Sequence, residues 1–395
     1  MDVISAITII LLFGLIFSKI AKVFKVPYII GYLFAGILIG PSLLNLITTS
    51  QTNNFESFSA ITLAFLSFMV GAELKVSYIK RIGYKSFVTA LFISLTTFLV
   101  ISVGMYIVIK DLPSALILGC VAATSAPAVI MNIFKDYDSK GNLTNTILGV
   151  IAVDDIISVL LFGIIITMLK SSDSTFTFLS LLMPFKEILL SIILGLGLGI
   201  LLGFLSKLFK NKYETIALVL AFILASITLT NYISVSSLLV CTVMGIFFTN
   251  FFKGKVTNNL LNVTDELLSL TLIIFFVSTG TILNISLIPQ IWIISLIFIV
   301  IRLLGKYFGA IIGMKVSKSE VDKSLGLCLL SQTGLSIGLV LASKSVLGPY
   351  YLQVQGIVVF TSIITDIISP IILKSILVKH ENIVIKKKLF NLKKS

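Results

Sequence analysis

The chain has 395 residues, of which 57% are hydrophobic and 12% are charged, and its mean hydropathy is +1.12. Soluble domains carry roughly 25% charged residues, about twice this share, so the composition excludes a soluble globular protein. The formal net charge of +13 is compatible with a nucleic-acid partner, but the positions of the basic residues favour a membrane.

Apolar runs of roughly 16 to 25 residues recur between polar breaks, which is typical of transmembrane helices. We therefore expect an all-α polytopic membrane protein with about 13 transmembrane helices. The predicted spans lie near residues 3–18, 28–48, 57–73, 87–109, 113–133, 146–169, 186–206, 215–230, 234–252, 266–284, 290–313, 324–343 and 353–376. Asp265 and Glu266 are expected in the first turn of the tenth span, where acidic residues favour a helix N-terminus. Residues 1–376 would form a single transmembrane unit, followed by a basic cytoplasmic tail at 377–395.

The lysines and arginines indicate how the spans are oriented. If the N-terminus lies outside, 24 of the 30 basic residues are cytoplasmic, four are outside, and Arg302 and Lys306 lie within a span. This asymmetry predicts a cytoplasmic C-terminus in a plasma-membrane protein. The net charge then reflects topology and attraction to the anionic lipid bilayer, not nucleic-acid binding.

Short stretches recur at an offset of 209 residues, which suggests an internal repeat. The pairs are AGIL at 35–38 with MGIF at 244–247, MVGAEL at 69–74 with STGTIL at 278–283, and TSAPAVIM at 124–131 with TGLSIGLV at 333–340. The offset corresponds to seven helices, an odd number, so the second copy would be inverted in the membrane. We expect inverted repeats near 28–169 and 234–376, an architecture found in many secondary transporters.

The fifth and twelfth spans carry matching signs of a broken helix. Pro127 lies in the middle of the fifth span, directly after Thr124 and Ser125, where it removes a backbone donor. The corresponding part of the twelfth span reads SQTG, with Gln332, Thr333 and Gly334. Ordinary packing of small residues would explain either segment alone, whereas their matching repeat positions favour two discontinuous helices.

Five ionisable residues fall inside the predicted spans: Asp154, Asp155, Arg302, Lys306 and Asp366. Neighbouring helix residues point about 100° apart, so Asp154 and Asp155 cannot share one face. One aspartate could pair with Lys306 while the other faces a water-filled cavity. The alternative is a salt bridge that only holds helices together, but one bridge does not require two costly buried carboxylates.

The predicted chemistry is competition for a carboxylate. Burial and a neighbouring like charge raise the proton affinity of a carboxylate, and a cation lowers it. Such a site holds either protons or a hard monovalent cation bound by oxygen ligands. Alternate access from the two membrane faces gives cation/proton exchange, with no enzymatic step and no cofactor.

At these residues the chain resembles the bacterial monovalent cation:proton antiporters, especially the second cation:proton antiporter family. The motifs are VPYIIGYLFAGILIGPSLL at 26–44, FLSFMVGAEL at 65–74, ATSAP at 123–127, VDD at 153–155 and LLGKYFGAIIG at 303–313. The resemblance implies the sodium/proton antiporter fold, with two crossed discontinuous helices in a mobile core. It also implies interleaved core and dimerisation domains, a homodimer and elevator-type alternating access.

The resemblance further implies roles for individual residues. Asp155 would bind the cation and the proton, which makes it and Asp154 the candidate metal ligands for a monovalent cation. Asp154 would pair with Lys306 in one state, and Thr124 and Ser125 would lie beside the site. Relatives with this pattern tend to be electrogenic sodium/proton exchangers, and for this chain we expect Na⁺ or Li⁺ as the exchanged cation.

Two features depart from the family pattern. Many relatives carry an acidic residue, often in an Arg-Gly-Glu motif, where this chain reads SQTGLS, and the SQ pair is similar to potassium-efflux members. Arg302 is an additional charge, which could partner Asp366 or an aspartate of the pair. A K⁺/H⁺ antiporter therefore stays open as an alternative.

Two further function classes fit the sequence less well. An intramembrane aspartyl protease needs two aspartates that reach one water molecule, which adjacent residues of a helix cannot easily do. A sodium-coupled symporter or a channel on the same scaffold fits inverted repeats, but Lys306 opposite the aspartates favours proton exchange.

Overall fold

The regular elements of the computed structural model are helices throughout the part of the chain that it describes. That part comprises residues 3–24, 26–48, 51, 55–74, 76–126, 130–131, 133–134, 139, 141–171, 183–209, 211–283, 285–319, 321–332 and 334–380. Pro127, Thr333 and most of the predicted tail at 377–395 lie outside these residues.

The helices of the first half are α1 (Val3–Val23), α2 (Tyr28–Ile39), α4 (Glu56–Glu73), α5 (Val76–Ile109), α6 (Leu112–Ala123), α8 (Asn142–Ser171) and α9 (Met183–Leu208). Those of the second half are α10 (Lys212–Ile233), α11 (Ser237–Phe251), α12 (Lys255–Ile282), η2 (Ile285–Leu287), α13 (Ile288–Ser317), η3 (Lys323–Leu329), α14 (Gly334–Ala342), α15 (Lys344–Leu347), η4 (Gly348–Tyr350) and α16 (Tyr351–His380).

Eight of the described helices are long and apolar enough to cross a membrane, or nine if the bent pair of η3 and α14 is one span. Four further apolar helices, α2, α4, α6 and α11, are shorter. α2 and α6 have 12 residues each, so they extend about 18 Å against a hydrocarbon core of about 30 Å. Each predicted span overlaps one of these elements, and the number of 13 membrane crossings stays a prediction.

The predicted start of the tenth span is wrong. α12 begins at Lys255, so Asp265 and Glu266 lie inside the helix and not in its first turn. Leu260 and Val263 are buried, and their spacing of three residues gives the additional turns an apolar face. Hydropathy alone misses such an amphipathic extension.

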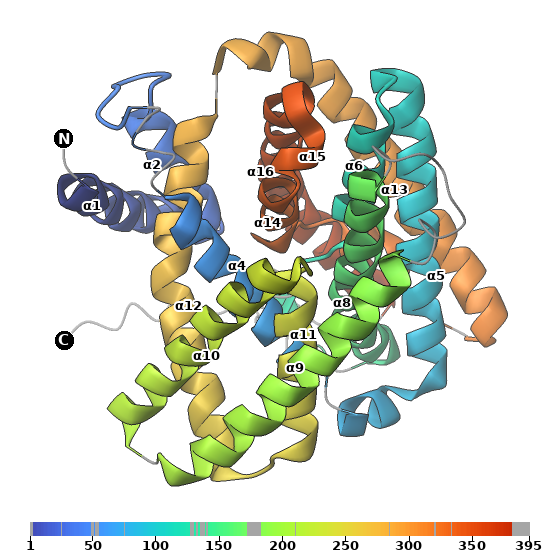
Figure 1. The fold of residues 1–395 in the computed structure, drawn as a ribbon. Helices are drawn as coiled ribbons and strands as arrows, with labels where there is room; N and C mark the ends of the chain where they lie inside the picture. The colour runs from blue at the N-terminus through green and yellow to red at the C-terminus, as the bar shows by residue number, and fades with distance from the viewer. Residues whose placement is uncertain are drawn as a thin grey trace, which may run out of the picture.

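The helices pack in long antiparallel and crossing pairs. α5 lies along α13, α4 along α11 and α2 along α12. In Figure 1, α14 and α16 lie in the middle of the view, with α1, α2 and α12 on the left and α5, α6 and α13 on the right. α8 is the most enclosed long helix, since 76% of its most apolar window is buried.

Two close helix contacts, each between a helix of the first half and a helix of the second half, have the same arrangement. A Cβ atom on Gly36 of α2 would lie 2.7 Å from the Cα atom of Gly280 in α12. A Cβ atom on Gly245 of α11 would lie 2.8 Å from the backbone nitrogen of Ala72 in α4, and one on Gly71 would meet the backbone of Thr242. Both contacts bring two backbones together at glycines, as small residues do in membrane helices. The four glycines are related by the repeat offset of 209 residues, since Gly36 corresponds to Gly245 and Gly71 corresponds to Gly280.

Candidate functional site

Asp154 and Asp155 lie near the middle of α8, a helix of 30 residues without an exposed face at this level. Asp154 is 0% exposed and Asp155 is 6% exposed. Bringing two carboxylates into such surroundings is costly unless other groups compensate them. The groups that could do so come from α13 and from two non-helical segments, called interruptions below: residues 124–126 after α6 and residues 330–332 after η3.

The first interruption follows α6. This helix begins at Leu112, and the side chain of its N-cap residue Asp111 accepts a hydrogen bond from the Ser114 backbone. It ends at Ala123, after which Thr124 is extended. The Thr124 hydroxyl lies 2.5 Å from the Ser336 hydroxyl of α14. The backbone nitrogen of Ser125 donates to Asp155 Oδ1 at 3.4 Å. The extended segment therefore presents backbone and hydroxyl groups to α8.

The second interruption separates η3 from α14, which are bent relative to each other by 66°. The non-helical residues of the two interruptions contact each other directly. The backbone nitrogen of Ala126 donates to the Ser331 carbonyl at 3.1 Å, and the Ser331 hydroxyl donates to the Ala126 carbonyl at 3.4 Å. Segments about 205 residues apart in sequence thus meet beside the aspartates.

α13 supplies the two buried cations, Arg302 and Lys306, one helical turn apart. Both side chains are fully enclosed, with 1% and 0% of their surface exposed. Gly305 and Gly309 on the same helix approach the backbone of α5 closely, so α13 is held against α5 while its cations face the two interruptions.

Lys306 joins α6 to α8. Its Nζ atom lies 3.5 Å from Asp154 Oδ2 and donates to the carbonyl of Ala123 at 2.6 Å and to the Ser125 hydroxyl at 2.8 Å. The last carbonyls of a helix lack intrahelical partners and carry partial negative charge. One ammonium group therefore compensates both the end of α6 and Asp154.

Arg302 binds main-chain carbonyls of both interruptions. Its Nε atom donates to Ala122 at 2.9 Å, and Nη2 donates to Thr124 at 2.8 Å and to Ser331 at 3.4 Å. Nη1 donates to the carbonyl of Leu330. The guanidinium group, whose donors form a rigid fork, thus bridges the C-terminal ends of α6 and η3. The sequence left Asp366 or an aspartate of the α8 pair as a possible charge partner of Arg302; the hydrogen bonds of its guanidinium group go to main-chain carbonyls.

Asp155 differs from Asp154 in its surroundings. Among the described residues, no cationic side chain lies within ion-pair distance of Asp155, whereas Asp154 has Lys306. Asp154 Oδ1 also lacks a hydrogen-bond partner within the described protein. The arrangement leaves carboxylate oxygens at the meeting point of α8 and the two interruptions.

Sequence reasoning left two residues out of the site. Ser336 holds the Thr124 hydroxyl, and no charge or motif distinguishes it from other small residues. Asp366 of α16 accepts a hydrogen bond from the backbone nitrogen of Gln332 at 3.0 Å. Its position as an ionisable residue inside an apolar span was the available signal.

Comparison with known proteins decides the family. Residues 7–379 match the family described as "Sodium/hydrogen exchanger, transmembrane". The chain belongs to this sodium/hydrogen exchanger family. It is therefore a cation:proton antiporter, a secondary transporter and not an enzyme, which excludes the intramembrane aspartyl protease.

Two curated relatives match the exchanger over nearly their whole length. The Na(+)/H(+) antiporter NhaS4 of Synechocystis sp. is 26% identical over 402 residues, which cover 92% of this chain and 93% of that protein. A Na(+)/H(+) antiporter of Enterococcus hirae is 26% identical over 386 residues, which cover 95% of this chain and 98% of that protein. The structure of the sodium proton antiporter MjNhaP1 from Methanocaldococcus jannaschii at pH 8 superposes with a TM-score of 0.70 at 19% identity, over 95% of each chain. This likeness shows the fold.

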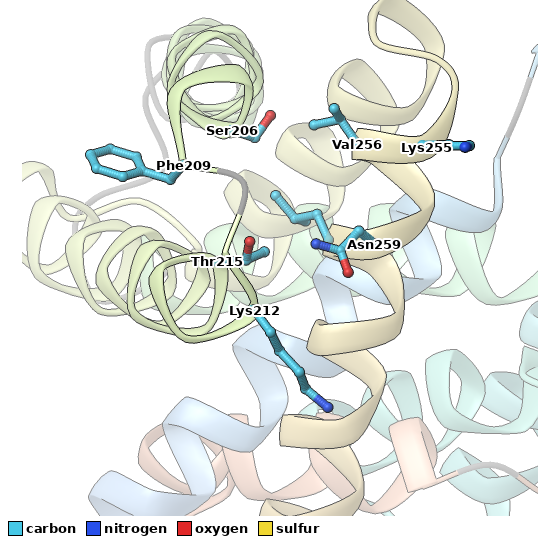
Figure 2. A pocket seen from close by; sticks show the side chains of 8 residues that line it. Ser206, Phe209, Lys212, Thr215, Lys255, Val256 and Asn259 are labelled. Carbon is cyan, nitrogen blue, oxygen red and sulfur yellow. The ribbon is translucent and has the colours of Figure 1, made fainter.

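The exchanger also has a cavity away from these charges. A volume of about 380 Å³ opens where α9 ends and where α10 and α12 begin. Figure 2 shows that the side chains of Lys212 and Lys255 extend in different directions and do not converge on the cavity. Lys212 instead pairs with Glu266 at 2.7 Å. The described lining residues include none of the buried charges of α8, α13 or α16, so the cavity is separate from the charged centre.

Proposed function

We propose that the chain exchanges Na⁺ or Li⁺ for protons, and that Asp155 is the carboxylate for which the cation and the proton compete. Thr124 and Ser125 lie beside it, and Asp154 is held by Lys306. The proposal refines the cation/proton exchange of the family by naming the ion and the residue.

The observation that carries the proposal is the imbalance of charge around Asp155. Among the described residues, the buried charged side chains are three aspartates, Asp154, Asp155 and Asp366, and two cations, Arg302 and Lys306. With all five ionised, the group carries one uncompensated negative charge. A single monovalent cation or a single proton removes it, and Asp155 is the carboxylate of the α8 pair without a cationic partner.

The exchange follows from this competition. A cation bound at Asp155 is stabilised by carboxylate and hydroxyl oxygens, the ligands that hard cations prefer. A proton on Asp155 removes the charge that attracts the cation, so the two occupants exclude each other. A full cycle of the site between the two membrane faces then carries the cation in one direction and protons in the other.

Internal symmetry supports alternating access. The repeat offset of 209 residues relates the contact of α2 with α12 to that of α11 with α4. Gly36 of the first contact corresponds to Gly245 of the second, and Gly280 corresponds to Gly71. The Thr62 hydroxyl also lies 3.4 Å from the carbonyl of Thr271, its own counterpart at this offset. Inverted repeats with discontinuous helices at the binding site are typical of such transporters. We propose two crossed discontinuous helices, an elevator movement of the core and a homodimer in the plasma membrane, with the N-terminus outside.

Sodium is favoured over potassium by the extent of the similarity. The two sodium antiporters above match more than nine-tenths of this chain, whereas the K(+) efflux antiporter 5 of Arabidopsis thaliana matches 38% of it. A sodium-coupled symporter would not need a proton to compete at Asp155, which makes proton movement the decisive measurement.

The test is proton flux in proteoliposomes with an imposed pH gradient. Sodium, lithium and potassium are added in turn to the wild type, to Asp155→Asn and to Asp111→Asn. Asp111→Asn is the matched control, because it makes the same chemical change at a helix N-terminus outside the charged centre. We expect flux triggered by sodium or lithium in the wild type and the control, and none in Asp155→Asn. Full flux in Asp155→Asn would exclude Asp155 as the binding carboxylate, and flux triggered by potassium alone would exclude sodium.

A further inference from the structure

Asp366 is a third buried carboxylate that the exchange at Asp155 does not use. It is 4% exposed, lies on α16, and accepts the backbone N–H of Gln332 at 3.0 Å. The side-chain oxygen of Gln332 in turn accepts hydrogen bonds from the Thr361 and Ser362 hydroxyls at 3.1 and 2.8 Å. Asp366 therefore belongs to a polar cluster between α16 and the second interruption.

This cluster continues along one face of α16. Four polar residues share this face: Gln355, Ser362, Asp366 and Ser369. Because each helical residue is rotated by about 100° from the one before, the four lie within an arc of about 60° around the axis, and they extend over about 21 Å along it. All four are buried, with between 0% and 5% of their surface exposed. A membrane helix does not bury a polar face of this length without a reason, because each unsatisfied polar group is costly.

Several polar atoms on this face, and one on Gln332 of the second interruption, have no hydrogen-bond partner within the described protein. They are both amide atoms of Gln355, the Nε2 atom of Gln332 and the hydroxyl of Ser369. Polar groups of this kind are usually satisfied by ordered water. The face therefore has the chemistry of a hydrated path that leads to Asp366.

Asp366 and Asp155 take equivalent places at the two interruptions. Asp155 accepts the backbone N–H of Ser125 beside the first, and Asp366 accepts that of Gln332 beside the second. Arg302 lies between them and binds carbonyls of both interruptions. Among the described residues, Arg302 of α13 is the charged group that interacts electrostatically with Asp366. The other elements packed against α16, which are α6, α8, η3, α14 and η4, contribute none.

We propose that Asp366 is a second proton-binding carboxyl of the exchanger, reached along the polar face formed by Gln355, Ser362 and Ser369. A proton suits the place better than a metal ion, because the described groups that face the carboxylate from Gln332 and Arg302 are N–H donors and cannot be metal ligands. On release, the O–H bond of the neutral carboxyl breaks, water accepts the proton, and the carboxylate that forms faces Arg302.

This proposal rests on the proposed function only for its link to transport, and its test separates the two. The variant Asp366→Asn keeps an oxygen that accepts the Gln332 N–H but cannot bind a proton at neutral pH. Infrared difference spectra between acid and alkaline pH, recorded without any transported cation, report the carboxyl groups that change protonation. We expect Asp366→Asn to lose one carboxyl band, different from the band that Asp155→Asn loses. A spectrum identical to that of the wild type would overturn the proposal even if the chain transported no ion.

Transport provides the second readout. We expect Asp366→Asn to retain sodium-driven proton flux with a displaced pH profile, whereas Asp111→Asn keeps the profile of the wild type. A merely structural role would lower the flux at every pH without moving the profile, and that result would also overturn the proposal.

A second variant keeps the proposal testable if Asp366→Asn does not fold. Gln355→Leu removes two buried polar atoms that have no partner in the described protein, so we expect it to fold at least as stably as the wild type. We expect it to retain the Asp366 carboxyl band and to slow its appearance several-fold after a pH jump. An unchanged rate would exclude the polar face as the path.

Discussion

Lys306 and Asp154 form an ion pair of 3.5 Å in which neither side chain is exposed to solvent. The same ammonium group is closer to the carbonyl of Ala123, at 2.6 Å. The pair is thus one part of a junction between α6, α8 and α13, so loss of the cation affects the end of a helix as well as a carboxylate.

Removal of the cation should destabilise the protein strongly. Lys306→Ala leaves Asp154 buried without its partner, which typically costs about 3 to 5 kcal/mol in the free energy of unfolding. The matched control is Lys212→Ala, whose pair with Glu266 is more than half exposed and of a kind that contributes about 0 to 1 kcal/mol. Thermal unfolding in detergent measures both variants. Equal melting temperatures for the wild type and Lys306→Ala would contradict a stabilising role of the Lys306–Asp154 pair. We also expect exchange by Lys306→Ala to depend less on the membrane voltage than exchange by the wild type.

Arg302→Lys should not preserve the role of Arg302, although it preserves the charge. The guanidinium group donates to carbonyls of Ala122, Thr124, Leu330 and Ser331, and an ammonium group lacks the planar fork that reaches both interruptions. We expect a lower melting temperature and at least tenfold slower exchange. If Arg302→Lys behaves like the wild type while Arg302→Met does not, the charge alone matters and the bridge does not.

The glycine contacts predict a contrast between two chemically identical substitutions. Gly36→Ala places a methyl group against the backbone of α12, and overpacking of this kind costs about 1 to 3 kcal/mol. Gly197→Ala on α9 meets no atom within 4 Å and should stabilise the helix by up to about 1 kcal/mol. Melting temperatures should therefore shift in opposite directions. A shift of the same sign in both would show that helix propensity outweighs the contact.

Competition at Asp155 predicts how exchange depends on pH. Protons and cations bind the same carboxylate, so the cation concentration for half-maximal flux should rise as the pH falls. For one competing proton, the rise reaches at most about tenfold per pH unit. Flux measured over a series of sodium concentrations at several pH values checks this. A half-maximal concentration that does not depend on pH would mean that the proton and the cation bind different groups.

The helices were largely predictable because apolar runs of membrane length leave little choice of structure. Their ends were less predictable. The predicted span 87–109 agrees with the apolar part of α5, Tyr84–Ile109, but the helix itself begins at Val76. Lysine and arginine are good helix formers, although hydropathy counts them against a span. The same limitation explains α12, whose first turns carry an amphipathic and not an apolar pattern.

The charged centre was predictable only in part. Ionisable residues inside apolar spans identify Asp154, Asp155 and Lys306 as a group. The structure places Lys306 Nζ 3.5 Å from Asp154 Oδ2. The carbonyl partners of Arg302 lie as far as 180 residues away in sequence, and main-chain groups leave no signal in a sequence. The contact of Asp366 with the backbone of Gln332 was hidden for the same reason.

Because Arg302 holds carbonyls on both sides of the junction, separating the two interrupted segments means breaking its bonds to at least one of them. Two hydrogen bonds to a charged group are worth about 3 to 6 kcal/mol together. At about 1.4 kcal/mol for each factor of ten, a separated arrangement would be roughly a hundred to ten thousand times rarer than the joined one. Thermal fluctuation therefore seldom displaces one of the two segments without the other, and the junction behaves mechanically as a single piece.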